Sequence, residues 1–281
     1  GKHRAAGLFG ATPGGPFGMD ELDFYGWLHT GGGLDLYHEL YQKELKRDVT
    51  IIPLAWVGYQ VFGWFAKPVK NWEDLKGRKC RQTGIFAEVI AKSGMSVVNM
   101  PGGEILPAAE RGLIECAEWA SPVDDMKIGF HLAWKNYYMP SVHEISPILE
   151  VLFNLATWNK MHPDQQQNMK TAAWEATVMQ RLQTNLWNVD AMEELKGKHG
   201  VTIHRTPDDI LRKTLKTWDQ MVIEESAKNP LFKKVTESQR SYASKVVPLR
   251  GSVYPDYSFT RAHYWPAKKS ATTSAHLGVG W

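Results

Sequence analysis

Arg81 and Glu118 are the residues whose type and position most clearly suggest ligand chemistry. Arg81 lies at the end of a predicted strand, residues 79–82, just before a turn at Gly84 and a predicted helix. Glu118 lies at the end of another predicted strand, residues 114–119. In open α/β sheets, ligands bind beyond the carboxyl ends of the strands, so both residues are expected to face one crevice. There Arg81 could hold a carboxylate with two parallel hydrogen bonds, although a surface salt bridge is the commoner role of a single arginine.

Glu118 and Glu144 could instead form the acid and base pair of a glycosidase. The 12 tryptophans of the chain would suit stacking on sugar rings. This second hypothesis has weak support, because carboxylate pairs occur in every chain. Motifs of the HExxH, CxxC, GxSxG, SxxK and EF-hand types are absent, and Gly31–Gly33 does not match a phosphate-binding loop.

The composition is that of an ordinary globular protein, with 43% hydrophobic and 22% charged residues in 281 positions. The formal net charge is only +3 and the basic clusters are short, so a nucleic-acid partner is not expected. No apolar run reaches the length of a membrane span. The first residues, GKHR, are not followed by the apolar segment of a secretory signal.

Alternating strands and helices must position Arg81 and Glu118. The pattern from residue 79 to 119 predicts a parallel sheet with helices on both faces. Residues 1–33 are rich in Gly and Pro and are expected to be mostly loop. Further predicted elements are a helix from Leu34, strands at 49–55, 61–65, 137–142, 148–156 and 201–204, and helices at 207–227 and 231–246.

A long helix is predicted over residues 163–198, because Pro163 suits a helix start and no proline follows within the segment. About 36 residues would span roughly 54 Å, so the helix is expected to cross from one lobe to another. Its apolar positions predict a single stripe, which could be used within one chain or in a homodimer: Met169, Ala172, Ala173, Ala176, Met179, Leu182, Leu186, Val189 and Leu195.

Two segments resemble the DctP-type solute-binding proteins of TRAP (tripartite ATP-independent) transporters. Residues 72–81, WEDLKGRKCR, resemble the family's DLKGxKxR signature, and residues 103–115, GEILPAAERGLIE, resemble its GEiyxALqrGxiD segment. Residues 109–110 and 115 depart from the second pattern. The pairs at 118–119, 137–138 and 143–144 resemble the branch that binds 2-oxo or 2-hydroxy monocarboxylates with a cation.

The resemblance, which covers about residues 17–250, implies an α/β periplasmic-binding-protein-like fold with two lobes and a long helix that packs on both. It implies that Arg81 forms a salt bridge with the substrate carboxylate. It also implies that Gln60, Glu118, the Trp119 backbone carbonyl and Glu144 surround a cation, with Gln60, Trp119 and Glu144 also near the substrate. These oxygen donors suit Na⁺ or Ca²⁺ and are poor ligands for zinc.

Charge counting favours Ca²⁺. Glu118, Glu144, Arg81 and a monocarboxylate together carry two negative charges, which a divalent ion neutralises and Na⁺ does not. Burying net charge is expensive. Because nearby dipoles or protonation could shift this balance, Na⁺ and Ca²⁺ both remain open, and no organic cofactor is expected.

The resemblance also predicts the domain organisation. Family members normally begin with a strand–helix–strand–helix unit, so an N-terminal part of lobe I, with a signal peptide, is expected to be missing here. The predicted division is an incomplete lobe I at 1–77 and 146–178, lobe II at 78–145 and 201–246, a spanning helix at 163–198 and a flexible tail at 268–281.

The two cysteines, Cys80 and Cys116, are expected on neighbouring strands. A disulfide would suit the periplasm, but neighbouring strand residues often have unsuitable geometry, so two buried free thiols are predicted.

The sequence thus predicts a periplasmic receptor, not an enzyme, which captures a small 2-oxo or 2-hydroxy acid and delivers it to TRAP membrane permease subunits. A carbohydrate-active hydrolase using Glu118 and Glu144 is the alternative, and the exact acid and the oligomeric state remain open.

Overall fold

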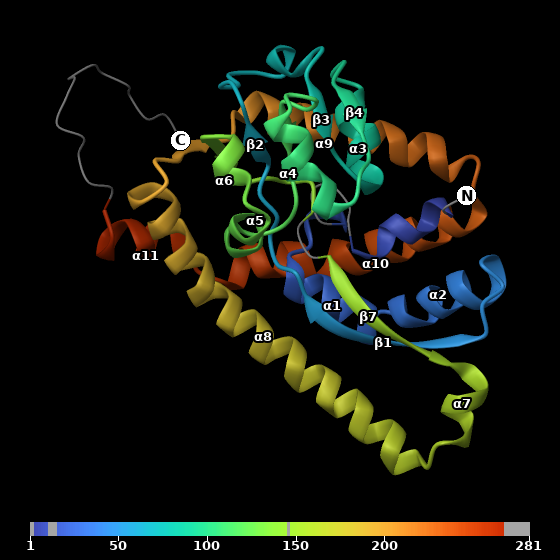
Figure 1. Cartoon of the computed structure of the whole chain (residues 1–281). Helices are drawn as coiled ribbons and strands as arrows, with labels where there is room; N and C mark the ends of the chain where they lie inside the picture. The colour runs from blue at the N-terminus through green and yellow to red at the C-terminus, as the bar shows by residue number, and fades with distance from the viewer. Residues whose placement is uncertain (1–2, 11–15, 145–146, 267–281) are drawn as a thin grey trace.

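The computed structural model describes residues 3–10, 16–144 and 147–266 and contains a six-stranded mixed sheet, whose strands β2, β3 and β4 lie in the upper part of Figure 1. Its order is β4-β3-β5-β2-β6-β8. Strand β3 is parallel to β4 and β5, and β6 is parallel to β8, whereas β2 is antiparallel to both of its neighbours. The predicted parallel unit is therefore confirmed. The strands are β2 (Gly63–Phe65), β3 (Lys79–Arg81), β4 (Ser96–Val98), β5 (Cys116–Ala117), β6 (Asn136–Met139) and β8 (Thr202–Arg205).

Helices cover both faces of this sheet, and alternate residues of its strands enter two different cores. Phe65 and Tyr138 pack into the core beneath α3 (Gly84–Ala91) and α9 (Asp208–Ser226). Their neighbours Trp64 and Tyr137 pack into a second core with α4 (Gly102–Glu110) and α6 (Phe130–Ala133). This two-sided burial confirms the predicted α/β class.

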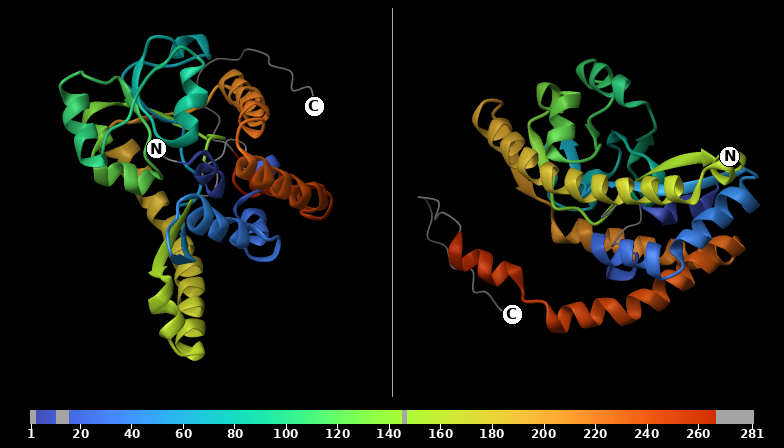
Figure 2. Two further views of the ribbon diagram at one scale, coloured as in Figure 1. Left: turned by 90° about the vertical axis from the view of Figure 1, so that its right-hand side faces the viewer. Right: turned by 90° about the horizontal axis from the view of Figure 1, so that it is seen from below.

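A second sheet pairs β1 (Val49–Trp56) with β7 (Ile148–Asn154) in antiparallel register. The long helix α8 (Pro163–Gly197) packs along β1, where Ile52 and Ala173 are buried together. Farther along, α8 contacts α5 (Pro122–Ile128), and its Asn188 accepts a hydrogen bond from the Val123 amide. Figure 2 shows α8 and the β1–β7 pair side by side, projecting from the main body. The predicted long helix is confirmed, and the lobe boundaries stay a prediction.

The prediction that the apolar residues of α8 form a single stripe is wrong. Ala173 and Leu195 are buried, but Met179, Leu182, Leu186 and Val189 are 49–70% exposed. The 3.6-residue period of a helix places these four residues opposite its buried face.

The prediction of a mostly looped N-terminal segment is also wrong. This segment contains η1 (Arg4–Phe9) and α1 (Glu21–Thr30). Asp20 begins α1 with a capping box, because its side chain accepts from the Asp23 amide and the Asp23 side chain accepts from the Asp20 amide. Phe24 and Trp27 then bury the inner face of the helix.

The remaining helices complete the molecule around α1 and the long helix. The helix predicted from Leu34 is confirmed, although a π-helical turn ends it. The helix predicted at 231–246 lies within a longer one, and the predicted tail at 268–281 falls outside the described residues. The bounds are η2 (Pro16–Gly18), α2 (Gly33–Glu39), η3 (Leu40–Glu44), η4 (Glu73–Leu75), α7 (Leu155–Lys160), α10 (Pro230–Val253) and α11 (Tyr257–Tyr264).

Cys80 and Cys116 form a disulfide, so the prediction of two free thiols is wrong. The two residues lie directly opposite each other in the parallel β3–β5 pair, with Cα atoms 4.6 Å apart. This register brings the side chains to the same face of the sheet, next to Arg81.

Within the described part of the chain, no helix combines the length and apolar character needed to cross a membrane.

Candidate ligand-binding site

A cavity of about 500 Å³ brings together four of the five predicted site residues. Strands β3 and β5 are parallel, so the residues at their carboxyl ends meet at one edge of the sheet. The loops after β1 and β6 reach the same edge, where the Gln60 amide donates to the Glu144 carbonyl at 3.1 Å. The cavity is lined by Ala55, Val57, Gln60, Arg81, Thr83, Trp119, Ala120, Asp124, Glu144, Pro147, Leu149 and Gln180.

Arg81 is almost completely buried and is held by Glu118. Its Nη1 donates to the backbone carbonyl of Glu118 at 2.5 Å and to Oε1 of the same residue at 2.8 Å. Its guanidinium also lies over the Trp119 ring, 5.0 Å from the centroid. The buried Nε of Arg81 has no hydrogen-bond partner. Glu118 itself does not line the cavity and lies behind the arginine.

The two carboxyl groups of the site are electrostatically linked. Burial raises the pKa of Glu118, although the neighbouring Arg81 charge lowers it. Burial also raises the pKa of Glu144, and the charge of Glu118 raises it further. Two buried acids of this kind favour a shared positive charge, which can be a proton or a bound cation.

His143 lies behind the two carboxyl groups and is fully buried. Its ring stacks on Phe86 with centroids 4.2 Å apart, and its Nε2 lies 3.7 Å from Oε2 of Glu118. Burial lowers the pKa of His143 to about 4, so the ring is neutral at physiological pH.

Asp125 fixes the turn that follows β5. Its carboxylate accepts from the Ala120 amide at 3.0 Å, the Trp64 indole at 2.8 Å and the Tyr137 hydroxyl at 2.8 Å. Burial raises the pKa of Asp125 to about 7, against the effect of these three donors, which lowers it. The turn that carries Trp119 is thus tied to two strands of the sheet.

Gly102 allows the Trp119 ring to occupy its place in the cavity wall. A Cβ atom at Gly102 would lie 2.7 Å from Cη2 of Trp119, which is closer than packed atoms can approach. The absence of a side chain at the start of α4 therefore positions the tryptophan.

Three polar residues of the cavity wall were missed by the sequence interpretation. Thr83 follows β3 within two residues of Arg81, so its position at a strand end could have indicated it. Asp124 and Gln180 come from α5 and α8, and no local pattern in those helices marks them. The buried Oε1 of Gln180 has no hydrogen-bond partner.

The donor set fits a hard cation. The buried Oε1 of Gln60 lacks a hydrogen-bond partner, and the Glu144 carboxylate shares its cavity. Among the described residues, no group of three or more His, Cys, Asp or Glu could hold a metal ion, so any cation here needs amide and carbonyl oxygens as well.

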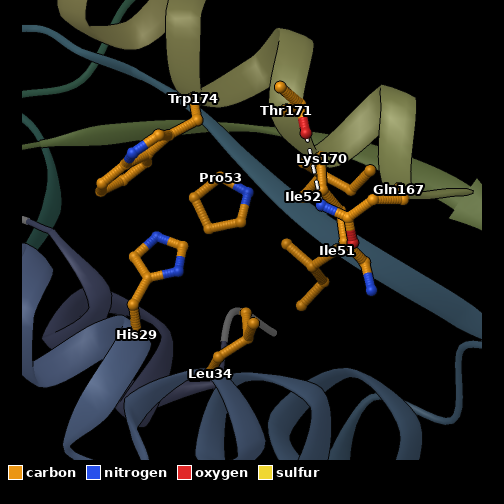
Figure 3. A pocket seen from close by; sticks show the side chains of 9 residues that line it. All are labelled: His29, Leu34, Ile51, Ile52, Pro53, Gln167, Lys170, Thr171 and Trp174. Carbon is orange, nitrogen blue, oxygen red and sulfur yellow. Dashed lines mark hydrogen bonds between the residues drawn. The ribbon is translucent and has the colours of Figure 1, made fainter.

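A second cavity, of about 380 Å³, contains none of the predicted site residues. Figure 3 shows it between β1, α8 and the helices α1 and α2, with His29 packed edge-on against Trp174. Its wall is mainly apolar, and Lys170 is its one charged residue apart from the titratable His29.

The sequence matches a known family of proteins. The family described as bacterial extracellular solute-binding protein, family 7 (DctP), matches residues 14–229. The chain belongs to this family. The predicted resemblance is confirmed, and an extracytoplasmic location follows from the family.

A curated relative is named for the solutes that it binds. The monocarboxylate 2-oxoacid-binding periplasmic protein of Nostoc sp. is 34% identical over 231 residues. The match covers 82% of this chain and 62% of the relative, so this chain spans less than two thirds of that protein's length.

Solved structures of DctP relatives contain both metal ions and carboxylates. A protein from Bordetella bronchiseptica, with copurified calcium and picolinate, has a TM-score of 0.84 at 28% identity and covers 92% of this chain and 76% of its own. A protein from Pseudoalteromonas atlantica, with sodium and pyruvate, scores 0.80 at 28% identity, with 91% and 75% covered. One from Colwellia psychrerythraea, with calcium and pyruvate, scores 0.80 at 28% identity, with 90% and 75% covered.

Proposed function

We propose that this chain is the solute receptor of a TRAP transporter and binds a 2-oxo or 2-hydroxy monocarboxylate together with Na⁺ or Ca²⁺. The observation that supports this most is the single cavity shared by Gln60, Arg81, Trp119 and Glu144. The cavity volume is within the range of small-molecule sites. The relatives that contain pyruvate with sodium or calcium support the same ligand class.

Arg81 would hold the ligand carboxylate through its Nε and Nη2 atoms. Its Nη1 is already bound to Glu118, and Nε is buried without a partner. The Nε–Nη2 edge of a guanidinium carries two parallel N–H groups, which match the two oxygens of a carboxylate. Arg81 can therefore keep its contact with Glu118 while it binds the ligand.

The cation would bind through Gln60, Glu144, Glu118 and the Trp119 backbone carbonyl. It would neutralise the buried carboxylates and attract the ligand's 2-oxo or 2-hydroxy oxygen. Charge balance favours Ca²⁺, because two carboxylates and a ligand carboxylate face one arginine.

A receptor role accounts for this site better than catalysis. Glu118 is ion-paired with Arg81, and this fixed charge pair does not suit the proton exchange required of the acid or base of a hydrolase. The family is one of solute binding, and the hydrolase alternative gains no support from it.

The receptor would deliver its ligand to the TRAP permease subunits, and we propose that it does so as a homodimer that pairs through α8. The exposed stripe of Met179, Leu182, Leu186 and Val189 supports this, since such a surface is rarely left uncovered. The relative from Bordetella bronchiseptica forms a dimer.

Calorimetry with pyruvate and lactate, in Ca²⁺, Na⁺ or chelator, tests the proposed function. The protein should bind at least one of these acids, and binding should weaken when Na⁺ is left out and Ca²⁺ is removed with chelator. Arg81→Lys keeps the charge but removes the paired N–H edge, so affinity should fall about tenfold or more. Arg212→Lys, on the exposed side of α9, is the matched control and should bind normally.

Two results would contradict the proposal. One is binding of sugar acids but of no 2-oxo or 2-hydroxy monocarboxylate. The other is unchanged affinity in Arg81→Lys.

A further inference from the structure

One nitrogen of the buried His143 ring lacks a hydrogen-bond partner. Its Nε2 makes no hydrogen bond and lies 3.7 Å from Oε2 of Glu118. Buried polar atoms in proteins are nearly always paired. The stack on Phe86 holds the plane of the ring, so Nε2 faces the carboxylate in a fixed direction.

The Ser141 hydroxyl favours one tautomer of the His143 ring. Its Oγ accepts a hydrogen bond from the His143 amide at 3.3 Å and also contacts Nδ1 of the ring. A hydroxyl that accepts from this amide still has its own proton to donate, and Nδ1 is the acceptor beside it. A neutral imidazole that accepts at Nδ1 carries its proton on Nε2, the atom that faces Glu118.

We propose that His143 is a positioning residue, whose Nε2–H donates to Oε2 of Glu118 while Arg81 holds Oε1. The carboxylate is thereby fixed from two sides, in the orientation in which it serves the cation. This inference rests on the proposed function. The atoms at 3.7 Å must approach by roughly 0.7 Å to form the bond, a movement that accompanies cation and ligand binding.

A neutral donor suits this position better than a charged one. Arg81 already supplies one positive charge to Glu118. A second cation on Oε2 would give the Arg81–Glu118 group a net positive charge and weaken the attraction for the metal ion. An N–H donor orients the carboxylate and leaves its charge available, which is the usual role of groups behind a metal ligand.

Two substitutions separate hydrogen bonding from packing. His143→Phe keeps a ring against Phe86 but has no donor, whereas His143→Gln places an amide N–H near the position of Nε2. With pyruvate and Ca²⁺, affinity should fall about tenfold or more in the Phe variant and be largely restored in the Gln variant. His131→Phe removes another buried imidazole outside the cavity wall and should bind normally. Normal affinity in His143→Phe, or equal losses in the Phe and Gln variants, would overturn the proposal.

A measurement on the ligand-free protein keeps this inference separate from the proposed function. Nitrogen-15 NMR of labelled histidine distinguishes the two neutral tautomers. His143 should be the Nε2–H form, with slow exchange of that proton, whether or not the protein binds pyruvate. An Nδ1–H tautomer would overturn the positioning role, whereas absence of pyruvate binding in the wild type would overturn the proposed function alone.

Discussion

Arg81 and Glu118 are each constrained by a neighbouring residue that carries a charge or a hydrogen-bonding group. Arg81 is held by Glu118, and Glu118 in turn faces His143. Glu144 lies near the start of α3, with Oε1 3.6 Å from where a Cβ of Gly84 would be. Gly84 has a φ of +63°, a conformation that favours glycine and lets the chain turn directly after Arg81. These contacts organise the site before a ligand arrives.

Calcium affinity should fall as the pH is lowered from 8 to 6. Burial raises the pKa of both Glu118 and Glu144 to about 7, so below that pH a proton occupies the carboxylates that the cation requires. Each displaced proton should weaken Ca²⁺ binding by up to about tenfold per pH unit. Calorimetry across this range measures the effect, and Glu144→Gln should flatten it. An affinity that rises in acid would contradict the cation set.

At the scale of elements, the parallel β3–β5 pair positions the main residues of the site. It places Arg81 beside Ala117 and aligns the turn that carries Trp119 with the cavity. The disulfide between Cys80 and Cys116 joins the same two strands, one residue before Arg81 and two before Glu118. The covalent link and the strand pairing therefore act on the same part of the sheet.

Reduction of the disulfide should lower the free energy of unfolding. The bond closes a loop of 36 residues. Without it the unfolded chain gains conformational entropy, which should lower the free energy of unfolding by about 4 kcal/mol. Urea unfolding with and without dithiothreitol measures the change. A double Cys80→Ser, Cys116→Ser variant is the control and should show no response to the reductant. Equal stability of the oxidised and reduced protein would contradict this prediction.

The two glycines at the start of α4 should respond differently to alanine. Gly102→Ala would push a methyl group against the Trp119 ring, so it should lower stability by about 1–3 kcal/mol and weaken pyruvate binding. Gly103→Ala meets nothing within 4 Å and should bind normally, with stability raised by up to about 1 kcal/mol. Denaturation and calorimetry of both variants provide the comparison. Equal effects of the two substitutions would show that the Trp119 contact does not matter.

At the scale of the whole molecule, α8 connects the two sheets. It packs on β1 at one end and on α5 farther along, and the Arg181 side chain forms an ion pair with Glu21 of α1. Gln180 of the same helix lines the cavity. A movement of one sheet relative to the other, as expected for a receptor that closes on its ligand, would therefore be transmitted along this helix.

The exposed stripe on α8 should mediate self-association. Leu186 is 70% exposed at the centre of the stripe, so Leu186→Glu should shift the proposed dimer to a monomer in sedimentation experiments. Ile223→Glu makes the same kind of change at an exposed apolar residue of α9, away from the stripe, and should leave the dimer intact. A wild-type protein that is monomeric at every concentration would rule out the proposed pairing.

The sequence by itself determined the features that depend on local patterns. Strand ends at residues 81 and 119 indicated the site, and the spacing of apolar residues predicted the parallel unit and the long helix. Local periodicity and turn chemistry specify such elements, because the responsible residues are close in the chain. The capping box that begins α1 was also present in the sequence, and the Gly- and Pro-rich surroundings obscured it.

Only the tertiary structure decided which distant residues meet. It placed Gln180 of α8 in the cavity, bound Arg81 to Glu118 and set Cys80 directly opposite Cys116. It also placed Leu186 on the exposed face of α8, opposite the buried Ala173 and Leu195, although their spacing suggested one stripe. The physical reason is that strand register and helix packing depend on the combined burial of many side chains, which no local segment of sequence contains.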